Sequence, residues 1–447
     1  MLWNKIYLDG TIQLSTTFSY KGGNLVNTAY LMNSIWVMIS AVLVILMIGG
    51  FILLETGSTR MKNAGHIAGK TILTFSIGSI VFWAVGYGLI FGKGNPLIGL
   101  ADFFYSGYDI KGLSLSGAVF FLFQLAFAGI SLTIAFGGFA ERAKFSIYLV
   151  FSVLFSVLIY PPIAHWIWGG GWLAKLGQQD FAGSTVVHLT GAMAAFAATI
   201  LLKPRIGKYN RDGSANNIAG HNQVFTALSV LLLWVGWFGF NAGSTLSVDK
   251  GFFGFVAMNT NLGAAGGTIA AMIVSWMVMG KADVPMMLNG ALSGLVAITA
   301  SSAFVEPWAA VVIGFIAGIL VFYSIRFFEK KNIDDPIAAL SVHGTAGVWG
   351  TLSTGFFATK ELATVGQPGL FYGGGFHQLG VQALGIISSG AYAFIVSFIL
   401  LYVLKLAMKG LRVSEEEELV GLDISEHGSY GYPELLQTAE KLKASNQ

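Results

Sequence analysis

The chain lacks cysteine and carries few charged residues. The absence of cysteine among its 447 residues excludes disulfides, thiolate metal ligands and cysteine nucleophiles. Charged residues make up only 11% of the chain, against about 25% in an ordinary soluble protein. Lipid, rather than water, is therefore the expected solvent for most of the surface. The net charge of +3 is also too small to indicate a nucleic acid as partner.

Long apolar runs take the place of charge. Hydrophobic residues make up 55% of the chain, and its 58 glycines would let membrane helices approach closely. A helical span needs about 20 mostly apolar residues, whereas a transmembrane barrel would show alternating segments of about ten. The sequence thus predicts an all-α membrane protein with eleven spans. The expected spans are 31–54, 70–92, 117–140, 145–166, 183–202, 223–245, 252–279, 284–301, 305–327, 337–357 and 378–407.

Positive charge is divided unequally between the two sides that eleven spans would create. Most Lys and Arg residues near span ends fall on one side, which includes the connections 55–69 and 203–222 and the chain after the last span. Lys70 belongs to this group as a residue expected at a membrane end. The positive-inside rule then places the N-terminus outside and the C-terminus in the cytoplasm.

The two ends of the chain differ from its apolar body, 31–412, which is the expected membrane domain. Residues 1–30 predict a polar external arm, without the pattern of a signal peptide. Residues 413–447 are acidic and polar, and they predict a cytoplasmic tail too short for a kinase-sized domain. Within that tail, 433–447 fit either a disordered end or a short surface helix.

Two segments of the chain echo each other. Asp180 precedes His188 by eight residues at the start of the fifth expected span, and Asp335 precedes His343 by the same spacing at the tenth. These spans would close two five-span halves and would run in opposite directions. The echo predicts an inverted five-plus-five repeat followed by a final helix, with the functional site near the midplane at the interface of the repeats.

His188 and His343 are the histidines that lie well inside expected spans. Ionisable residues inside a span are costly and are functional candidates, although each ring could also be a neutral core histidine bonded to a neighbouring helix. Two neutral imidazoles can share one hydrogen bond and pass or accept a proton through their other nitrogens. A metal site is disfavoured, because these spans offer no third ligand.

The chain resembles the ammonium transporter (Amt/Rh) family, on its Amt side. The resemblance runs from about residue 30 to 432 and rests on several long motifs in the family's order. These motifs are Phe123-Gln-Leu-Ala-Phe127, Ala140-Glu-Arg142, Pro162-Ile-Ala-His165, Trp168-Gly-Gly-Gly171, Asp180-Phe-Ala-Gly-Ser-Thr-Val-Val-His188-Leu-Thr-Gly-Ala192, Trp237-Phe-Gly-Phe240-Asn241-Ala-Gly-Ser244, Val342-His343-Gly344, Gly421-Leu-Asp423 and Glu426-His-Gly428.

The resemblance implies an external vestibule that recruits ammonium. Phe127, Trp168 and Ser244 match the family's vestibule, and Phe123 shares the face of Phe127 at i, i+4. From the sequence alone, Trp168 could be an ordinary membrane-interface anchor, and Ser244 could bond to its own helix backbone. A vestibule for a charged substrate argues against a neutral gas channel of the Rhesus type.

The resemblance also implies a closed pore behind the vestibule. Phe127 and Phe240 match the stacked rings that close it, and His188 and His343 match the twin histidines within it. The two phenylalanines could equally be core aromatics of an apolar bundle. Asp180 is interpreted as a structural cap at the start of its span rather than as a proton carrier.

The family further implies homotrimers with one pore per subunit, in a plasma (inner) membrane crossed many times. The tail residues Gly421, Asp423, His427 and Gly428 match a segment that docks on the cytoplasmic face, where PII-type regulatory proteins can plug the pore. An alternative function is an ammonium sensor that signals through a separate partner. No cofactor and no metal are implied. An enzyme is disfavoured, because the ionisable groups form no nucleophile–base–orienter set.

Overall fold

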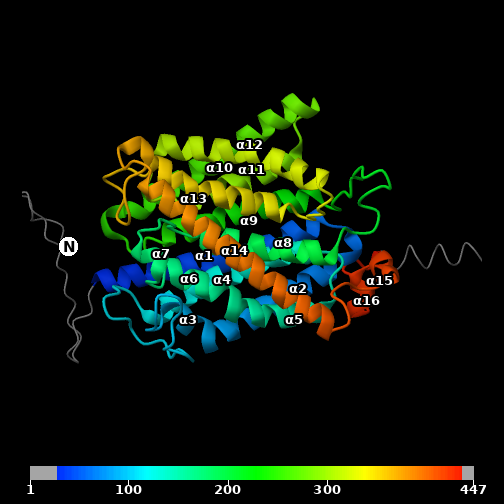
Figure 1. The fold of residues 1–447 in the computed structure, drawn as a ribbon, viewed down its shortest axis with the longest axis horizontal. Helices are drawn as coiled ribbons and strands as arrows, with labels where there is room; N and C mark the ends of the chain where they lie inside the picture. The colour runs from blue at the N-terminus through cyan, green and yellow to red at the C-terminus, as the bar shows by residue number, and fades with distance from the viewer. Residues whose placement is uncertain (1–27, 435–447) are drawn as a thin grey trace, which may run out of the picture.

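The computed structural model describes residues 28–434, and within that range the protein is built from helices joined by loops (Figure 1). The all-α prediction is confirmed for these residues, whereas the arm predicted for 1–30 lies almost entirely outside them. The elements are α1 (Thr28–Ser58), η1 (Met61–Asn63), α2 (Ala64–Val81), η2 (Phe82–Gly86), α3 (Tyr87–Phe91), α4 (Gly117–Phe136), η3 (Gly137–Phe139), α5 (Phe145–Leu154), η4 (Phe155–Ile159), α6 (Tyr160–Ile167), α7 (Trp172–Lys175), η5 (Ser184–Leu189), α8 (Thr190–Leu202), α9 (Gln223–Trp237), η6 (Phe238–Ala242), η7 (Asp249–Gly251), α10 (Phe252–Met279), α11 (Val284–Thr299), α12 (Pro307–Lys330), η8 (Leu340–Thr345), α13 (Ala346–Phe357), η9 (Leu370–Tyr372), α14 (His377–Ala407), α15 (Glu415–Val420) and α16 (Leu422–His427).

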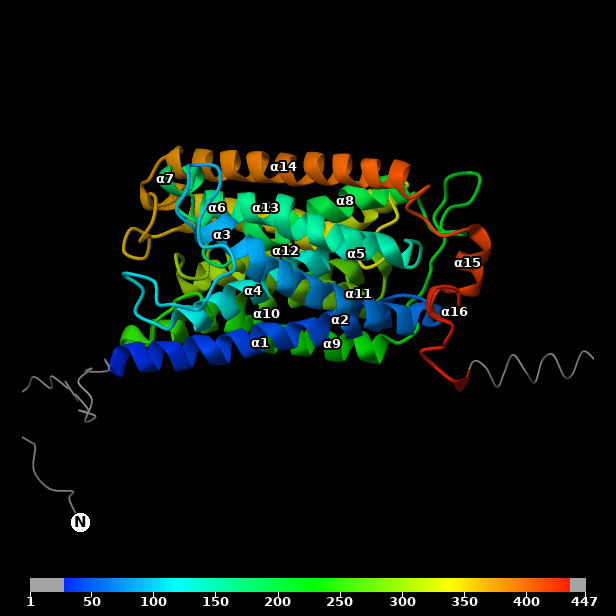
Figure 2. The ribbon, with the colours of Figure 1, turned by 90° about the horizontal axis from the view of Figure 1, so that it is seen from below.

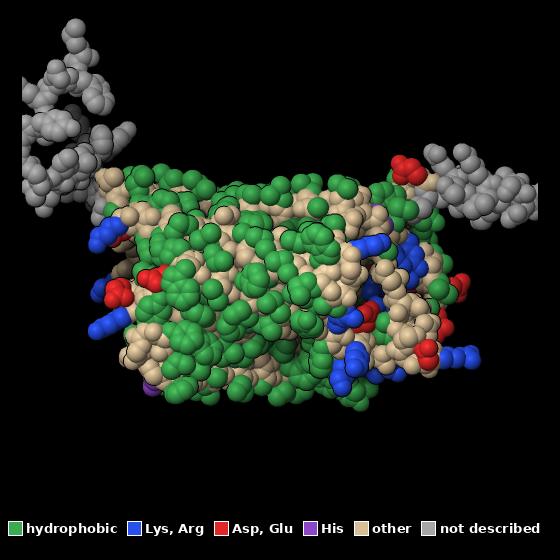
Figure 3. Space-filling model, turned by 90° about the horizontal axis from the view of Figure 1, so that it is seen from above, with side chains coloured by type: hydrophobic (Ala, Val, Ile, Leu, Met, Phe, Trp, Pro, Cys, Tyr) green, Lys and Arg blue, Asp and Glu red, His purple; other side chains and the backbone are tan. Residues whose placement is uncertain are grey.

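The long helices run side by side along one axis, with loops gathered at its two ends (Figures 1 and 2). On the face seen in Figure 3, hydrophobic side chains cover the middle, and Lys, Arg, Asp and Glu side chains collect at the ends. Among the described residues, nine helices are long and apolar enough to cross a membrane. This arrangement is that of a multi-pass membrane protein, with an apolar belt between two polar ends.

Two expected spans are shorter or less regular than the others. The eighth is α11, a helix of 16 residues, and the tenth joins η8 to α13 over Leu340–Phe357. Both are packed inside the bundle rather than along its lipid-facing surface, because most of their residues are buried. The count of eleven crossings and the direction of the chain through the membrane stay predictions.

The two segments of the echo run in opposite directions. The backbone N–H of Arg205, just after α8, donates to the carboxylate of Asp334, just before η8, at 2.8 Å. At the other end, the Gln382 amide bridges the carbonyl of Gln179, before η5, and that of Thr351, within α13. The start of one segment therefore lies beside the end of the other, as an inverted repeat would require.

Lys70, which the sequence places among the charges near membrane ends, forms a buried ion pair. The structure buries its side chain completely, with Nζ 2.6 Å from a carboxylate oxygen of Glu55, also buried. The ammonium lies 5.6 and 5.4 Å from the ring centroids of Phe136 and Tyr148. Helix continues from Ala64 through Lys70, so the polar connection 55–69 is shorter than predicted and the pair lies between packed helices.

Residues 413–434 of the tail fold against one end of the bundle, at the right in Figure 2. Ser414 starts α15 with a capping box, in which its hydroxyl accepts from the Glu417 backbone and the Glu417 carboxylate accepts from the Ser414 backbone. Glu418 on the same short helix is buried, with its carboxylate held by the Arg412 guanidinium at 2.6 and 2.9 Å. The acidic run Glu415–Glu418 therefore lies in a short helix, and Glu418 holds that helix in place.

Candidate functional site

A cavity of about 260 Å³ opens at the end of the bundle opposite the tail, and it contains all four residues expected in the vestibule. Phe123, Phe127, Trp168 and Ser244 come from three separate parts of the chain, on α4, after α6 and after η6. Sequence reasoning missed most of the remaining lining, which belongs to unremarked aromatic and aliphatic positions. The full lining is Phe91, Phe120, Phe123, Gln124, Phe127, Ile167, Trp168, Phe181, Ser244 and Leu246.

The inner end of this cavity is closed by two stacked rings. The centroids of Phe127 and Phe240 lie 4.0 Å apart, with an interplanar angle of 21°. Phe123 packs on Phe127 at 4.7 Å, and Trp168 meets it edge-on at 5.9 Å. Phe123, Phe127 and Phe240 are fully or almost fully buried, so the stack is a tight apolar barrier rather than a surface patch.

Ser244 and Trp168 are both anchored by hydrogen bonds to the backbone. The Ser244 hydroxyl donates to the Phe240 carbonyl at 2.8 Å, and the Trp168 indole N–H donates to the Asp180 carbonyl at 2.7 Å. Each residue is half-buried, so part of it faces the cavity. Because the only hydroxyl hydrogen of Ser244 is used on the backbone, the group can offer an oxygen lone pair to a donor in the cavity.

His188 and His343 meet directly behind the stacked rings. Their Nδ1 atoms are 3.2 Å apart, and the rings are nearly parallel, with centroids 5.2 Å apart and an angle of 11°. The His188 ring lies 5.6 Å from Phe240, so the aromatic stack and the imidazole pair form one continuous column. Both histidines are buried, as expected of residues deep inside the bundle.

While both rings are neutral, the shared hydrogen bond decides which of the two outer nitrogens, the Nε2 atoms, is a donor and which is an acceptor. One ring must carry its hydrogen on Nδ1 to donate, so its Nε2 is an acceptor; the other accepts at Nδ1, so its Nε2–H is a donor. Nε2 of His188 is buried and has no hydrogen-bond partner within residues 28–434. A buried polar atom without a partner marks a place where a small polar molecule can bind.

Sequence reasoning missed two rings that hold the histidine pair. Trp237 stacks on His188 with centroids 5.2 Å apart and an angle of 17°, while its indole N–H donates to Thr299 at 2.8 Å. The ring centroids of Phe51 and His343 lie 6.1 Å apart. Trp237 starts the motif that ends at Ser244, so its place in that motif was the available signal, whereas nothing around Phe51 distinguished it from other apolar residues of its span.

The two aspartates of the echo have the same structural task. Asp180 accepts from the backbone N–H groups of Gly183, Thr185 and Val186, at 2.9 to 3.0 Å. Asp335 accepts from two backbone N–H groups at the start of η8, at 2.9 and 2.7 Å. Burial raises the pKa of both carboxyl groups to about 6, although the backbone donors oppose the rise. Neither carboxylate hydrogen-bonds to a histidine; each holds the start of a histidine-bearing segment.

These two segments are π-helical, which no sequence pattern indicated. His188 lies in η5 and His343 in η8, and Phe240 lies in a third π segment, η6. A π turn widens the helix locally and leaves part of its hydrogen bonding irregular, and such turns are frequent at functional sites. Three of the expected pore residues therefore come from locally widened helices.

The four expected tail residues lie at the opposite end of the bundle from the cavity. Asp423 is buried and accepts from the backbone N–H groups of His66 at 2.7 Å and Gly431 at 2.9 Å. Nε2 of His427 lies 3.0 Å from Nδ1 of His66. Gly421 precedes α16 and Gly428 follows it. Their φ angles are 108° and 67°, in the positive region that favours glycine.

Buried charges connect the tail to the loops around it. Arg205 contacts Glu141 at 3.0 Å and Asp334 at 2.8 Å, and Glu141 also pairs with Arg60. The hydrogen bonds and positive charge of Arg205 hold the pKa of Asp334 at about 2, against the opposing effect of burial. Glu418 of the tail lies 3.9 Å from Arg60, at the edge of the same network. Tail and loops thus share one set of ion pairs.

Comparison with known proteins identifies the group to which the chain is related. A sequence profile described as the Ammonium Transporter Family matches residues 35–432. The chain belongs to the ammonium transporter family. It is 44% identical to "Ammonium transporter Amt2" of Archaeoglobus fulgidus, over 91% of this chain and 90% of that protein. It is also 38% identical to "Ammonium transporter" of Bacillus subtilis, over 90% of this chain and 98% of that one.

Solved structures of this family have the same fold. A structure titled "Sensor Amt Protein" superposes with a TM-score of 0.85 at 41% identity, covering 89% of this chain and 99% of that chain. Candida albicans Mep2 superposes with a TM-score of 0.79 at 29% identity, covering 86% and 87%. The resemblance drawn from the motifs is therefore confirmed.

Among the described residues, no group of three or more His, Cys, Asp or Glu is arranged to hold a metal ion.

Proposed function

We propose that this protein transports ammonium across a plasma membrane, through a pore that passes from the Trp168–Ser244 vestibule between Phe127 and Phe240 to His188 and His343. The observation that supports this route best is the unbroken column of rings, with Phe127 on Phe240 at 4.0 Å and Phe240 beside His188 at 5.6 Å. The cavity lies directly outside that column.

Recruitment at the vestibule depends on aromatic faces and one hydroxyl oxygen. An ammonium ion loses hydration on entering the cavity, and a ring face returns about 0.5–2 kcal/mol by cation–π attraction. Ammonium also donates a hydrogen bond to the Ser244 oxygen, whose own hydrogen is held by the Phe240 carbonyl. These contacts favour a small cation with N–H donors and retain it at the mouth of the pore.

Passage beyond the phenylalanine stack requires ammonium to lose its proton. Carrying an ion into a low-dielectric column costs an idealised tens of kcal/mol, far more than the vestibule contacts supply. Ammonia is neutral and small, so it can pass the rings and bond to the outer nitrogens of the histidine pair, one acceptor and one donor. Potassium has no proton to lose, and this difference gives selectivity beyond size. Ammonia crosses with or without the separated proton. Where the proton crosses too, the acceptor Nε2 of one ring takes it up, the shared Nδ1 hydrogen shifts to the other ring, and that ring releases its Nε2 hydrogen.

The remaining expectations are part of the same proposal. The N-terminal arm faces the outside, 31–412 form the membrane domain, and the tail from 413 regulates the pore from the cytoplasm. The protein acts as a homotrimer with one pore in each subunit. A PII-type regulatory protein binds the cytoplasmic face, where Glu418 and Asp423 hold the tail against the bundle.

The test is the charge moved by an ammonium pulse across a solid-supported membrane containing the purified protein. Wild type is expected to give an ammonium-dependent current and no potassium current. The double variant His188→Ala with His343→Ala is expected to lose the current or its discrimination against potassium. His377→Ala, which alters an exposed histidine, is the matched control and should behave as wild type. A double variant with unchanged current and selectivity would refute the route through the pair.

An ammonium sensor that signals through a separate partner is the second candidate. It is favoured by the 41% identity to the structure titled "Sensor Amt Protein", which this chain covers almost completely. Tight ammonium binding without any current or ammonia flux would support the sensor. Flux at a rate that equilibrates the liposomes would support the transporter.

A further inference from the structure

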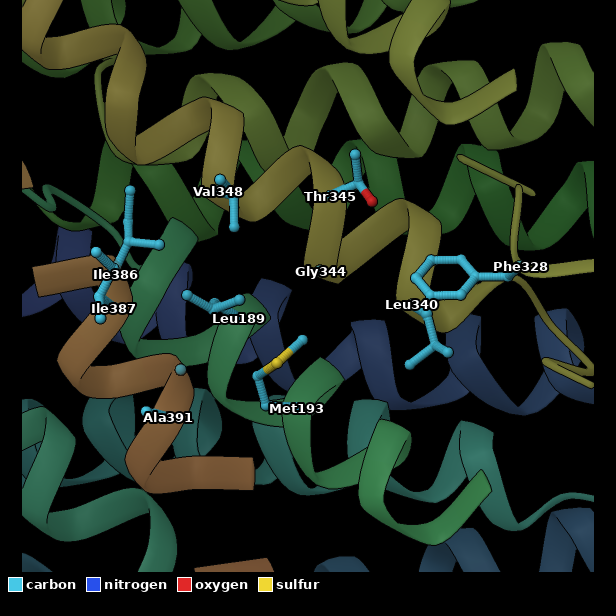
Figure 4. Close-up of a pocket in the computed structure, with 11 residues that line it drawn as sticks. Leu189, Met193, Phe328, Leu340, Gly344, Thr345, Val348, Ile386, Ile387 and Ala391 are labelled. Atoms are coloured by element: carbon cyan, nitrogen blue, oxygen red, sulfur yellow. The ribbon is translucent and has the colours of Figure 1, made fainter. Parts of the chain in front are cut away.

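A second cavity, of about 370 Å³, lies on the flank of the bundle rather than at its mouth. It is bounded by the end of η5, by α8, by the C-terminal end of α12, by the η8–α13 segment and by the middle of α14 (Figure 4). In that view Ile386 and Ile387 lie at one end of the cavity and Phe328 at the other. The lining therefore extends from the middle of α14 to the C-terminal end of α12.

The lining offers almost no polar group. Thr345 supplies its one side-chain hydroxyl, and that oxygen is already 2.7 Å from the Ser324 hydroxyl. Cavities lined by apolar side chains stay dry and take up apolar molecules; one of about 150 Å³ holds benzene. The lining is Leu189, Met193, Phe328, Leu340, Gly344, Thr345, Val348, Ile386, Ile387, Gly390 and Ala391.

The cavity faces the hydrocarbon layer. Ile387 on its rim is 68% exposed, and Ala391, one turn further along α14, is exposed as well. Both lie in the middle of a 31-residue helix that is long enough to cross a bilayer. An occupant must therefore come from the membrane and must be apolar, and the acyl chain of a lipid is the apolar group that a bilayer supplies.

Positive charge lies beyond the inner end of the cavity. Lys330 is the last residue of α12, and Lys331 follows it, three residues after Phe328. The Lys331 ammonium lies 5.9 Å from the centroid of the neighbouring Phe327 ring. Both lysines are exposed, and neither forms an ion pair within residues 28–434. The ion pair nearest in sequence is that of Glu329, which holds Lys208. This end belongs to the cytoplasmic side in the orientation proposed above, and the lipids of that leaflet are partly anionic.

We propose that the flank cavity binds one acyl chain of an anionic phospholipid from the inner leaflet, with the phosphate near Lys330 and Lys331. The apolar lining accepts the chain, and the ammonium groups of Lys330 and Lys331, which form no ion pair within residues 28–434, accept the headgroup. The choice of leaflet rests on the orientation in the proposed function, whereas the acyl-chain site rests on the cavity itself.

The site is placed to steady the histidine segments. Leu189 and Gly344, on the floor of the cavity, directly follow His188 and His343. A lipid chain in the cavity packs against the backs of η5 and η8, whose π turns are less regular than an α-helix. Bound lipid thereby restrains the two elements that hold the imidazole pair together.

Gly390 gives a way to fill the cavity from inside. A Cβ atom added there would meet Leu189 and Met193 side-chain atoms at 3.6 to 3.9 Å, which are ordinary contact distances, and Gly390 itself lines the cavity. Gly380, on the same helix, has no neighbour within 4 Å of an added Cβ. Gly390→Leu therefore fills the site, and Gly380→Leu is the matched control with the same change of residue outside it.

The experiment counts dioleoyl phosphatidylglycerol bound to the purified full-length protein by native mass spectrometry, with dioleoyl phosphatidylcholine as the neutral-headgroup probe. Gly390→Leu is expected to lose one high-affinity phosphatidylglycerol per chain, whereas Gly380→Leu retains it. Lys330→Gln with Lys331→Gln is expected to weaken phosphatidylglycerol about tenfold and to leave phosphatidylcholine unchanged. Ala391→Phe fills the site from its exposed rim and covers the case in which Gly390→Leu does not fold.

The proposal would be overturned if folded Gly390→Leu or Ala391→Phe, the two variants that fill the cavity, bound as many lipids as the control Gly380→Leu. It would also be overturned if the filling variants changed the number of chains per particle without changing lipid binding, because a second copy would then cover the cavity. These measurements need no transport, so loss of the proposed transport function would leave the lipid result standing. A lysine variant that binds both lipids normally would refute the headgroup assignment.

Discussion

The Nδ1 atoms of His188 and His343 face each other at 3.2 Å across rings only 11° from parallel. The pair joins two π-helical segments from opposite halves of the chain, each started by an aspartate whose carboxylate accepts from backbone N–H groups. The sole hydrogen between the two Nδ1 atoms makes the rings unequal while both are neutral, so the pair works as a unit rather than as two independent groups.

The first prediction is that substitutions in the histidine pair are not additive. His188→Ala and His343→Ala each remove the shared hydrogen bond, so each is expected to lower the ammonium current by about tenfold or more, and the double variant to lose little beyond the worse single one. Current amplitudes at saturating ammonium, normalised to protein content, give the comparison. Losses that multiply would contradict the coupling.

The second prediction concerns the vestibule hydroxyl. Ser244→Ala removes an acceptor for the ammonium ion, and a hydrogen bond to a charged group is worth about 1.5–3 kcal/mol, so the half-saturating ammonium concentration should rise at least about tenfold. The maximal current should change little, because the residue lies outside the aromatic stack. Ser388→Ala removes a similar back-bonded hydroxyl from α14 and serves as control. An unchanged half-saturation would place ammonium elsewhere in the cavity.

The third prediction is a pH dependence of stability that arises from Asp334. Its pKa is about 2 in the folded protein and near 3.8 when unfolded. A lowered carboxyl pKa gives stability that is fully present above the unfolded value and is lost as pH falls through the folded one. Asp334→Asn should lower the free energy of unfolding by about 2–3 kcal/mol at pH 7, because Arg205 loses one of its two carboxylate partners and keeps Glu141.

Thermal unfolding in detergent, followed by tryptophan fluorescence from pH 7 to pH 2.5, measures this effect. The difference in melting temperature between wild type and Asp334→Asn should stay constant down to about pH 5 and shrink below pH 4. The exposed Asp249→Asn should show no such difference at any pH. A gap that stays constant to pH 2.5 would mean that the carboxylate charge does not matter.

The fourth prediction concerns docking of the tail. Glu418→Gln weakens the contacts to Arg412 and Arg60 and the bond from the Ile206 backbone, so the tail should open more often. Limited proteolysis of the last segment should become about tenfold faster, since breaking a buried ion pair costs more than the 1.4 kcal/mol that this factor represents. Glu416→Gln, on the exposed face of the same helix, should be cleaved at the wild-type rate. Equal cleavage of the two variants would show that Glu418 does not hold the tail.

The fifth prediction separates the buried pair of Glu55 and Lys70. Lys70→Met leaves an uncompensated carboxylate among packed helices and should destabilise the protein by about 3–5 kcal/mol. Adding Glu55→Gln removes that charge and should recover most of the lost melting temperature. A double variant that is no more stable than the single one would show that the lysine acts through packing.

The helical architecture could be predicted because lipid leaves little choice. Backbone groups in hydrocarbon must be satisfied within their own segment, so a run such as 378–407 is expected to be a helix from its composition alone. The meeting of Phe127 with Phe240, or of His188 with His343, could not be derived in this way, because it depends on how distant helices pack. Their motifs supplied it only through resemblance to a family.

Other features gave no signal in the chain. Lys70 reads as a flanking charge because it lies at the start of an apolar run, and its partner Glu55 ends the run before; only packing shows that both are buried. The sequence gives no indication of the flank cavity either, since Gly344 and Gly390 are two among 58 glycines. A cavity is defined by atoms that are absent, and a sequence does not record where neighbouring helices fail to fill space.

The π segments have a consequence for how the chain tolerates insertions and deletions. A π turn holds one more residue than an α turn, so deleting a single residue from η5 would restore a regular helix there. With 3.6 residues per turn, everything on one side of the deletion would rotate by about 100° relative to the other. His188 would then point away from His343, although composition and length would hardly change. At η5 and η8, the number of residues is as much a part of the site as their identity.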